Sequence, residues 1–208
     1  MPLSTSIPKV PVRFPGDEED SWVDLNEELN RNNIIFLCDE LEAEISNEIM
    51  ALMIYLGEDK TQSLYFFINS PGGEVINGIA IDNVMQLIRS PVMTICLGIA
   101  ASMASYILAG GAYKKRVAFP HARIMIHQPS ANLNKYKDED EDEDEEVESI
   151  DLLYAEFTEL LNLRETLARG YSKRTGKPLW IISQDIERDV YMSATEAQAY
   201  GIVDHVGI

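Results

Sequence analysis

Cysteine and histidine are both scarce in this 208-residue sequence, which contains two of the first and three of the second. The cysteines, Cys38 and Cys96, each stand at the end of an apolar run, where burial is favoured over pairing. A secreted scaffold held by disulfides is therefore not expected. Instead, we expect the protein to work in a reducing compartment. We assign no metal ligands.

Basic residues are also few, since 17 Lys and Arg stand against 35 Asp and Glu, for a formal net charge of −18. Binding to a nucleic-acid backbone draws on counterion release and needs a basic face, so a nucleic-acid partner is not expected. Half of the net charge comes from nine consecutive acidic residues, 138–146. Such a run repels itself and buries no apolar surface, so we expect a solvated, disordered loop there.

Long apolar runs are missing as well. The two longest, 91–97 and 99–108, are broken by small or polar residues and fall short of the ~20 residues that cross a bilayer, so no membrane span is expected. Residues 1–22 contain four of the nine prolines and an acidic patch, but no apolar core of signal-peptide length and too little arginine for a typical transit peptide. We expect a mobile, irregular arm at 1–22 and a folded domain at 23–208.

The remaining pattern is typical of an α/β fold, because short β-branched or aromatic runs alternate with segments of helical period. Strands are expected at 34–38, 64–69, 92–97, 116–119 and 124–127, and helices at 41–56, 75–88 and 102–108. A Ser-Pro-Gly-Gly turn that ends at Gly73 follows the second strand. This order favours mainly parallel pairing through right-handed crossovers.

The last third of the chain is mostly helical. Residues 150–169 form an amphipathic pattern, and a second helix follows Pro178. Ser193 and Glu196 have the spacing of a capping box, and Gly201 is expected to end that helix before a strand at 202–206.

Three residues are candidates for nucleophilic catalysis. Ser102 lies where a strand passes into a helix, among small residues, so its hydroxyl is open to substrate and unpaired helix N–H groups lie beside it. His127 ends a strand and could act as general base, and Asp189 precedes a short strand and could orient the imidazole. Taken singly, each segment fits an ordinary role better: tight helix packing for Ser102, a hydrogen-bonded core histidine for His127, and an ion pair with Arg188 or Arg174 for Asp189. Ser105 is the rival nucleophile, and His121 and His205 are the other histidines.

Together these residues resemble one family, the proteolytic subunits of Clp proteases. The motifs FINSPGG ending at Gly73, GIAASM ending at Met103, RIMIHQP around His127, and ERD with MSA around Asp189 match in the family's order of serine, histidine and aspartate. The similarity runs from about residue 22 to 206 and fails only around the acidic segment, which is read as an insertion at about 137–148. The segments IPKVP and RTGKPLW are similar to plastid-encoded members in particular.

The resemblance implies a crotonase-like ClpP fold with a projecting helical handle, and a serine endopeptidase that cuts unfolded polypeptides and short peptides. It implies Ser102 as nucleophile, His127 as base and acid, Asp189 as orienting group, and the N–H groups of Gly73 and Met103 as oxyanion donors. It also implies two stacked seven-membered rings of such subunits that work with a Clp-family AAA+ ATPase. ATP is then used by that partner, and this subunit needs no cofactor.

Two further implications concern partners and place. Family members bind their ATPase through apolar pockets between adjacent subunits, and the matching positions are Tyr65, Phe67, Leu87 and Val117, each of which also fits an ordinary strand or helix core. The plastid-like segments and the missing transit peptide point to the chloroplast stroma, with a bacterial-type cytoplasm as the alternative.

The sequence departs from the family at three places. Ala104 replaces a glycine, which adds a methyl group beside the site. Residues 130–134 replace a glycine-rich stretch that pairs with substrate, and Cys38 replaces another glycine. Two alternatives stay open: a non-catalytic ring subunit, which predicts a lost triad residue, and an acyl-CoA hydratase or isomerase of the crotonase type, which usually relies on glutamates.

Overall fold

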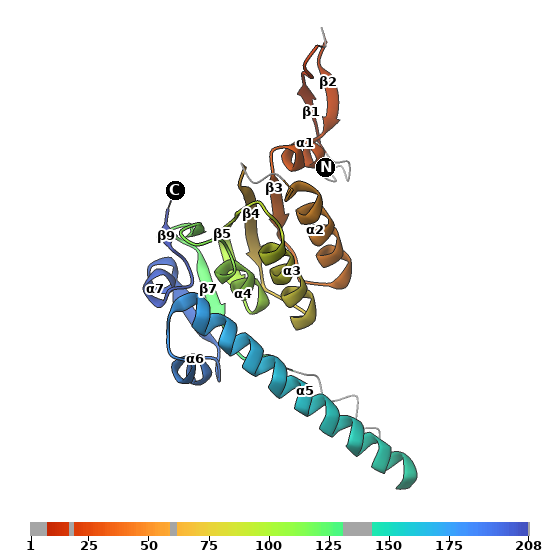
Figure 1. Cartoon of the computed structure of the whole chain (residues 1–208), viewed down its shortest axis with the longest axis vertical. Coiled ribbons are helices and arrows are strands. Elements are labelled where there is room, and N and C mark those ends of the chain that lie inside the picture. Colours follow the sequence, from red (N-terminus) through yellow and green to blue (C-terminus); the bar gives the residue numbers. More distant parts are fainter. Residues whose placement is uncertain (1–7, 17–18, 59–61, 131–142, 208) are drawn as a thin grey trace, which may run out of the picture.

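The computed structural model describes residues 8–16, 19–58, 62–130 and 143–207. Figure 1 shows a compact body with a small β-hairpin at one end and a long helix that projects from the other. No helix among these residues has the length and apolar character needed to cross a membrane. The body alternates strands and helices, so the expected α/β class is confirmed.

The centre of the body is a mostly parallel sheet in the order β3-β4-β5-β6-β9. The longest strand, β5, pairs with β4 on one side, and on the other with β6 through its first half and β7 through its last residues. An antiparallel strand, β8, joins β7. The strands are β3 (Ile34–Leu37), β4 (Leu64–Ser70), β5 (Val92–Ala101), β6 (Arg116–Ala118), β7 (Arg123–Ile126), β8 (Val190–Ser193) and β9 (His205–Val206).

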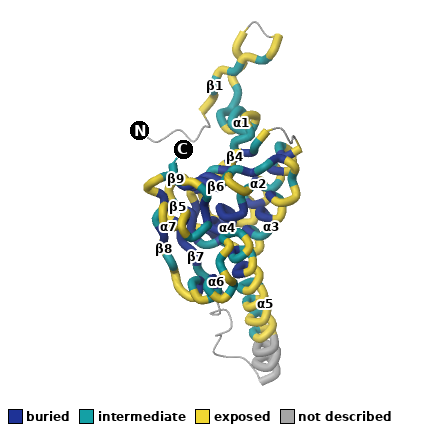
Figure 2. Tube along the Cα trace, turned by 60° about the vertical axis from the view of Figure 1, so that its left-hand side comes forward, coloured by how far each residue is buried: buried dark blue, intermediate teal, exposed yellow. Residues whose placement is uncertain are grey.

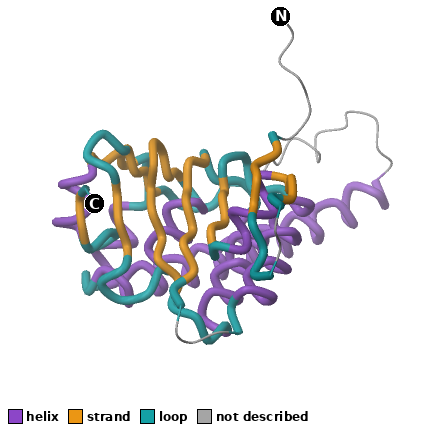
Figure 3. Tube along the Cα trace, turned by 90° about the horizontal axis from the view of Figure 1, so that it is seen from above, coloured by secondary structure: helices purple, strands orange, loops and turns teal. Residues whose placement is uncertain are grey.

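Most helices gather on one side of these strands, as Figure 3 shows from above. Their bounds are α1 (Leu25–Arg31), α2 (Ala43–Leu56), α3 (Val75–Leu87), α4 (Met103–Ala109), α5 (Glu143–Thr175), α6 (Leu179–Asp185) and α7 (Ala194–Tyr200). The short helix α4 is buried along its whole length, and in Figure 2 it lies among the dark blue core segments.

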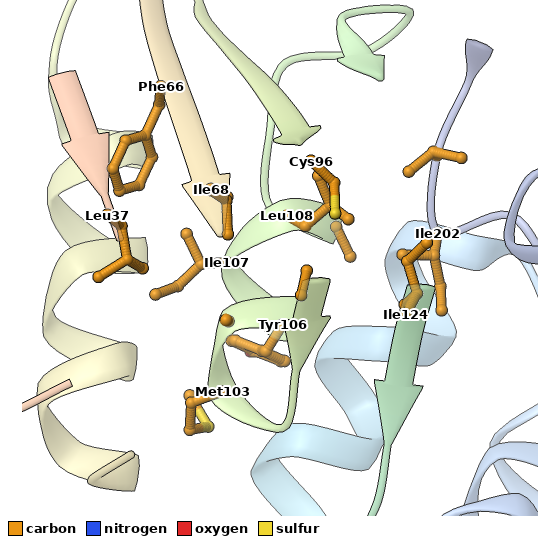
Figure 4. Close-up of a cluster of buried hydrophobic side chains, with 14 of the residues drawn as sticks. Leu37, Phe66, Ile68, Cys96, Met103, Tyr106, Ile107, Leu108, Ile124 and Ile202 are labelled. Carbon is orange, nitrogen blue, oxygen red and sulfur yellow. The ribbon is translucent and has the colours of Figure 1, made fainter. Parts of the chain in front are cut away.

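The core between the sheet and α4 positions the candidate site. Its side chains come from sheet strands and from α4, as Figure 4 shows for Phe66, Ile68, Cys96, Ile107 and Leu108. All five are fully buried. Because burial of one such aliphatic or aromatic side chain contributes about 1.5–3 kcal/mol, the end of β5 and the start of α4 rest on a rigid base.

The N-terminal segment differs from the irregular arm that its prolines suggested. Two strands, β1 (Lys9–Val12) and β2 (Ser21–Asp24), pair as an antiparallel hairpin, and the backbone N–H of Leu25 donates to Pro8. Alternating valines favour strand structure, and a two-stranded ribbon has only edge strands, where Pro11 is tolerated. The expectation of irregular structure was wrong for these residues, while mobility of the arm stays a prediction.

The projecting helix α5 begins earlier than expected. It starts at Glu143, so the loop expected at 138–146 is wrong for Glu143 to Glu146, and 138–142 lie outside the described residues. Glutamate has a high intrinsic helix propensity, which favours helix in this segment. At ~1.5 Å per residue this 33-residue helix is about 50 Å long, which fits the expected handle.

The C-terminal elements match the sequence pattern closely. The capping box of Ser193 and Glu196 is present, and Gly201 ends α7 in the left-handed conformation. The final strand is shorter than expected, because the N–H of Ile202 turns back to the carbonyl of Ala197 and only His205 and Val206 pair with β6.

Candidate active site

Ser102 occupies the junction between β5 and α4 in a conformation rare for a residue with a side chain, at φ 55° and ψ −126°. Such a backbone costs roughly 1–3 kcal/mol and persists only where the surroundings impose it. Here the N–H of Ser102 donates to Met125 at 3.0 Å, and its carbonyl accepts from the N–H of Ser105 at 3.0 Å. The serine is therefore fixed from both neighbouring elements.

The rival serine has a structural role. Ser105 is fully buried, and its hydroxyl donates to the Ser102 carbonyl at 2.6 Å and lies 2.7 Å from the hydroxyl of Tyr171 on α5. Burial raises the pKa of Tyr171, so its hydroxyl stays neutral and available as a partner. Ser105 has no access to substrate and instead helps to hold the Ser102 backbone.

His127 follows directly after β7, which pairs in parallel with the end of β5. This pairing brings the Nε2 atom of His127 to 2.8 Å from Oγ of Ser102, a hydrogen-bonding distance for a nucleophile and its base. His121 is exposed in the turn between β6 and β7, and His205 is exposed on β9. Of the three histidines, His127 is therefore the one that the fold brings to the serine.

Asp189 lies on the other side of the imidazole. Its Oδ1 atom is 3.3 Å from Nδ1 of His127, so the alternative ion pair with an arginine gives way to the histidine. Arg174 contacts the buried carboxylate of Asp82 instead. The Asp189 side chain is 59% exposed, so the serine and histidine are held more tightly than the acid.

The glycine turn after β4 approaches the serine closely. A Cβ atom on Gly72 would lie 2.7 Å from Cβ of Ser102 and 3.0 Å from the backbone nitrogen of Met103. The turn is held by the N–H of Leu41, which donates to Gly72 at 2.8 Å, and by that of Glu74, which donates to Leu41 at 3.0 Å. Met103 is the first residue of α4, so its N–H has no acceptor within the helix.

A groove of about 390 Å³ begins next to this turn. It runs from Glu74, which follows Gly73, to Ser130, three residues after His127, and α5 forms its other wall. The lining is mixed apolar and acidic, from Glu74, Val75, Ile76, Ser130, Glu156, Glu159, Leu160 and Leu163. A chain segment with an apolar side chain could lie in it.

The four residues expected to bind an ATPase are not all together. Tyr65, Phe67 and Val117 line one apolar cavity of about 350 Å³ on the sheet, along with Met93, Ile95, His205 and Gly207. Leu87 is 77% exposed at the end of α3 and does not line this cavity. The structure therefore brings three of the four expected positions together and leaves Leu87 outside this cavity.

Sequence reasoning missed two residues that support the site. Tyr171 lies beyond the amphipathic pattern read at 150–169, and nothing in the sequence distinguishes it as a hydroxyl that reaches Ser105. Arg164, also on α5, donates to Gln128, the neighbour of His127. The position of Arg164 in the sequence does not indicate a contact next to His127, so only the fold could identify this residue.

Comparison with known proteins agrees with this geometry. The model of the Clp protease family matches residues 16–208. The chain is 54% identical to an ATP-dependent Clp protease proteolytic subunit of Nicotiana tabacum, over 209 aligned residues that cover all of both chains. It is equally identical, with the same coverage, to the chloroplastic ATP-dependent Clp protease proteolytic subunit 1 of Arabidopsis thaliana, and 53% identical to the subunit of Cucumis sativus over 99% of this chain and all of that one. The chain therefore belongs to the Clp protease family, whose members are serine peptidases that form oligomers and work with Clp ATPases.

Proposed function

We propose that this chain is a catalytically active subunit of a ring-shaped, ATP-dependent protease, and that it cuts unfolded polypeptides and short peptides through a Ser-His-Asp acyl-enzyme mechanism. The series of contacts from Ser102 through His127 to Asp189 carries the proposal. Nε2 of His127 is hydrogen-bonded to Oγ of Ser102 at 2.8 Å, and Nδ1 of His127 lies 3.3 Å from Oδ1 of Asp189. A non-catalytic ring subunit is disfavoured because all three residues are in place. A crotonase-type hydratase is disfavoured because it has no need for this series.

In the proposed mechanism Ser102 Oγ attacks the peptide carbonyl while Nε2 of His127 accepts its proton. The imidazolium then gives this proton to the leaving amine, which departs and leaves an ester on Ser102. Water attacks the ester while His127 accepts its proton. The bond between the acyl carbon and Oγ of Ser102 then breaks, and the imidazolium returns the proton to Oγ as the acid product is released. Asp189 holds the imidazole through Nδ1 and stabilises its cationic form.

We assign the oxyanion donors to the N–H groups of Gly73 and Met103. The close approach of Gly72 to the Met103 nitrogen supports this, because it places the two donor segments side by side beside Ser102. Fixed N–H donors of this kind stabilise the charge that develops on the carbonyl oxygen. The groove between the glycine turn and α5 is suited to an apolar side chain of the substrate.

We further propose that the chain forms two stacked seven-membered rings with other ClpP-type subunits and that a Clp-family AAA+ ATPase feeds them unfolded protein. The handle supports assembly, because α5 exposes large apolar side chains, Leu152, Tyr154, Phe157 and Leu161, that an isolated chain would leave in water. Tyr65, Phe67 and Val117 from one chain with Leu87 from its neighbour would form the ATPase pocket. ATP acts in the partner, and this subunit needs no cofactor of its own.

A plastid location, the chloroplast stroma, is the proposed site of action. Full-length identity of 54% to a subunit named chloroplastic supports it. Localisation of a tagged copy by fractionation of intact plastids would test it, and a signal confined to the cytosol would contradict it.

The test of activity uses the purified complex that contains this subunit. A fluorogenic peptide and a phosphonate reagent specific for activated serines are added to wild-type and Ser102→Ala proteins. We expect wild type to cleave the peptide and to be labelled on Ser102, and the variant to do neither. A wild-type subunit that takes no label would indicate a non-catalytic ring member, and turnover of an enoyl-CoA thioester without peptide cleavage would indicate the crotonase alternative.

Docking is tested separately with Tyr65→Ser and Leu87→Ser, two positions exposed enough to change without damaging the core. Each should weaken degradation of a folded protein in the presence of ATPase and ATP, while cleavage of small peptides stays at the wild-type rate. Equal loss of both activities would mean damaged folding rather than lost docking.

A further inference from the structure

The candidate histidine and aspartate lie just beyond the end of a β-ladder. The antiparallel pairing of β7 with β8 ends at the pair Ile126 and Val190, and the next residues are His127 and Asp189. Ladder ends open more easily than centres, because the last residues have a partner on one side only. Contacts outside the β7–β8 ladder are therefore needed to keep the side chains of His127 and Asp189 3.3 Å apart.

Contacts with one arginine surround this open end. Arg164, on α5, donates through Nε to Oε1 of Gln128 at 3.0 Å and through Nη2 to the carbonyl of Ser183 at 2.9 Å. The same Nη2 lies 3.7 Å from a carboxylate oxygen of Glu187. A guanidinium is a planar fork with fixed donors, so it can bind several acceptors at once with little loss of freedom.

These partners flank the two candidate catalytic residues in sequence. Gln128 follows His127, and Glu187 precedes Asp189 by two positions. The backbone N–H of Gln128 also donates to the carbonyl of Ile186 at 2.6 Å, which joins the two segments directly. Arg164 thus connects the histidine segment, the end of α6 and the aspartate segment to the handle.

The side chain of Arg164 is partly shielded from water, which strengthens its hydrogen bonds. The Arg164 side chain is 28% exposed, and two of its acceptors are neutral oxygens held by the fold, whereas Glu187 is 66% exposed and contributes a screened interaction. Hydrogen bonds with a charged donor are shorter and stronger than neutral ones, so these two bonds can hold the attached segments in place.

We propose that Arg164 is a positioning residue for catalysis: it holds His127 and Asp189 in register from the handle helix. This inference rests on the proposed function, since it assumes that these two residues take part in the reaction. Its consequence is that the handle supports the geometry of the active site as well as offering an apolar surface for assembly.

The test measures kcat and KM for a fluorogenic peptide in the purified oligomer carrying Arg164→Ala, with Arg169→Ala as a matched control. Arg169 lies on the same helix, is exposed, and pairs with Glu165 alone among the described residues. Misplacement of reacting groups by up to ~1 Å can cost on the order of 10²-fold. We expect Arg164→Ala to lower kcat about 10- to 100-fold with KM within about twofold of wild type, and Arg169→Ala to change neither.

Rescue and coupling separate positioning from a general loss of folding or assembly. Arg164→Lys keeps one charge-assisted bond but not the fork, so its kcat should fall between those of wild type and Arg164→Ala. Gln128→Ala removes the acceptor from the other side, so the two alanine changes together should lower kcat by less than the product of their separate effects. Native mass spectrometry checks that each variant keeps the wild-type assembly.

The outcomes are distinct for the two proposals. A Ser102→Ala protein that cleaves peptide as fast as wild type would overturn the proposed function itself. If Ser102→Ala is inactive but Arg164→Ala matches Arg169→Ala in kcat, the positioning role is overturned. Full additivity of Arg164→Ala with Gln128→Ala, or loss of activity only through loss of oligomer, overturns it as well.

Discussion

The two ends of the candidate triad are built differently. Ser102 is fixed in a strained backbone between a central strand and a fully buried helix, and its carbonyl accepts hydrogen bonds from Ser105. Asp189 is 59% exposed on a short segment between α6 and β8. Packing of the core holds the nucleophile, whereas the acid is exposed and contacts Nδ1 of His127 at 3.3 Å. The proposed reaction needs the most precise placement at the nucleophile, because its position relative to the oxyanion donors decides whether a bond can form.

Removal of the nucleophile should cause the largest loss of activity. Ser102→Ala should abolish peptide cleavage, since loss of a triad serine in a well-studied protease costs about 10⁶-fold in kcat. The fold should persist, because the side chain contributes little to packing. Ser105→Ala is the informative companion: it should retain measurable cleavage but lower the melting temperature, because it removes a buried hydrogen-bond partner of Tyr171. Activity lost in Ser105→Ala and kept in Ser102→Ala would reverse the assignment.

The glycine turn lies beside Ser102, at the end of the site that the core holds. Its disruption should cause the second-largest loss of kcat. Gly73 has φ 148°, and a Cβ there would meet the backbone of Leu41 at 2.6 Å, so Gly73→Ala should displace the turn. Loss of one oxyanion donor costs about 10²–10³-fold in kcat. Gly176→Ala is a control, because it also has positive φ but open space around it. It should cost about 1 kcal/mol of stability and leave kcat unchanged. Comparable kcat losses in both would contradict the role of Gly73.

The exposed end of the triad should tolerate change better. Asp→Asn in a protease with a buried triad aspartate costs about 10⁴-fold. For Asp189→Asn we expect a smaller loss of kcat, about 10- to 100-fold, because water can replace part of an exposed carboxylate. The measurement is kcat for a fluorogenic peptide at pH 7. A 10⁴-fold loss would show that Asp189 becomes buried in the working complex and would remove the contrast between the two ends.

A partly buried carboxylate outside the candidate triad, Asp204, gives the smallest expected effect on activity. Asp204 accepts from Nη2 and Nε of Arg116 at 2.6 and 2.9 Å, across β6 and the start of β9. Burial raises the pKa of Asp204, but hydrogen bonds and the charge of Arg116, with a smaller contribution from His205, outweigh it and hold the pKa below its usual value.

A lowered pKa in the folded state gives stability that is present above the unfolded-state pKa and is lost as the pH falls through the folded-state value. Asp204→Asn should therefore destabilise the protein by about 1.5–3 kcal/mol at neutral pH and flatten the fall in stability below about pH 4. Denaturant unfolding across pH checks this. Peptide cleavage at neutral pH and moderate temperature should stay unchanged, and an unchanged acid profile in the variant would contradict the role of Asp204.

The sequence alone predicted the α/β class, most helices and strands of the body, the capping box at Ser193 and, through the family resemblance, three candidate catalytic residues. Periodicity, turn chemistry and caps are local, so they could be read without a structure. The same local signals failed where context decides, as in the hairpin around Pro11 and the helical start of α5 at Glu143.

Only the tertiary structure decided which of the two serines contacts a histidine, and that Asp189 contacts His127 rather than an arginine. It also decided that Arg164 joins the segments of His127 and Asp189 to the handle. These relations join residues 23 to 62 positions apart in sequence. Their distances depend on which strands pair and on which side chains the core buries. Strand pairing is a long-range property of the whole fold, so no local pattern in the chain encodes it.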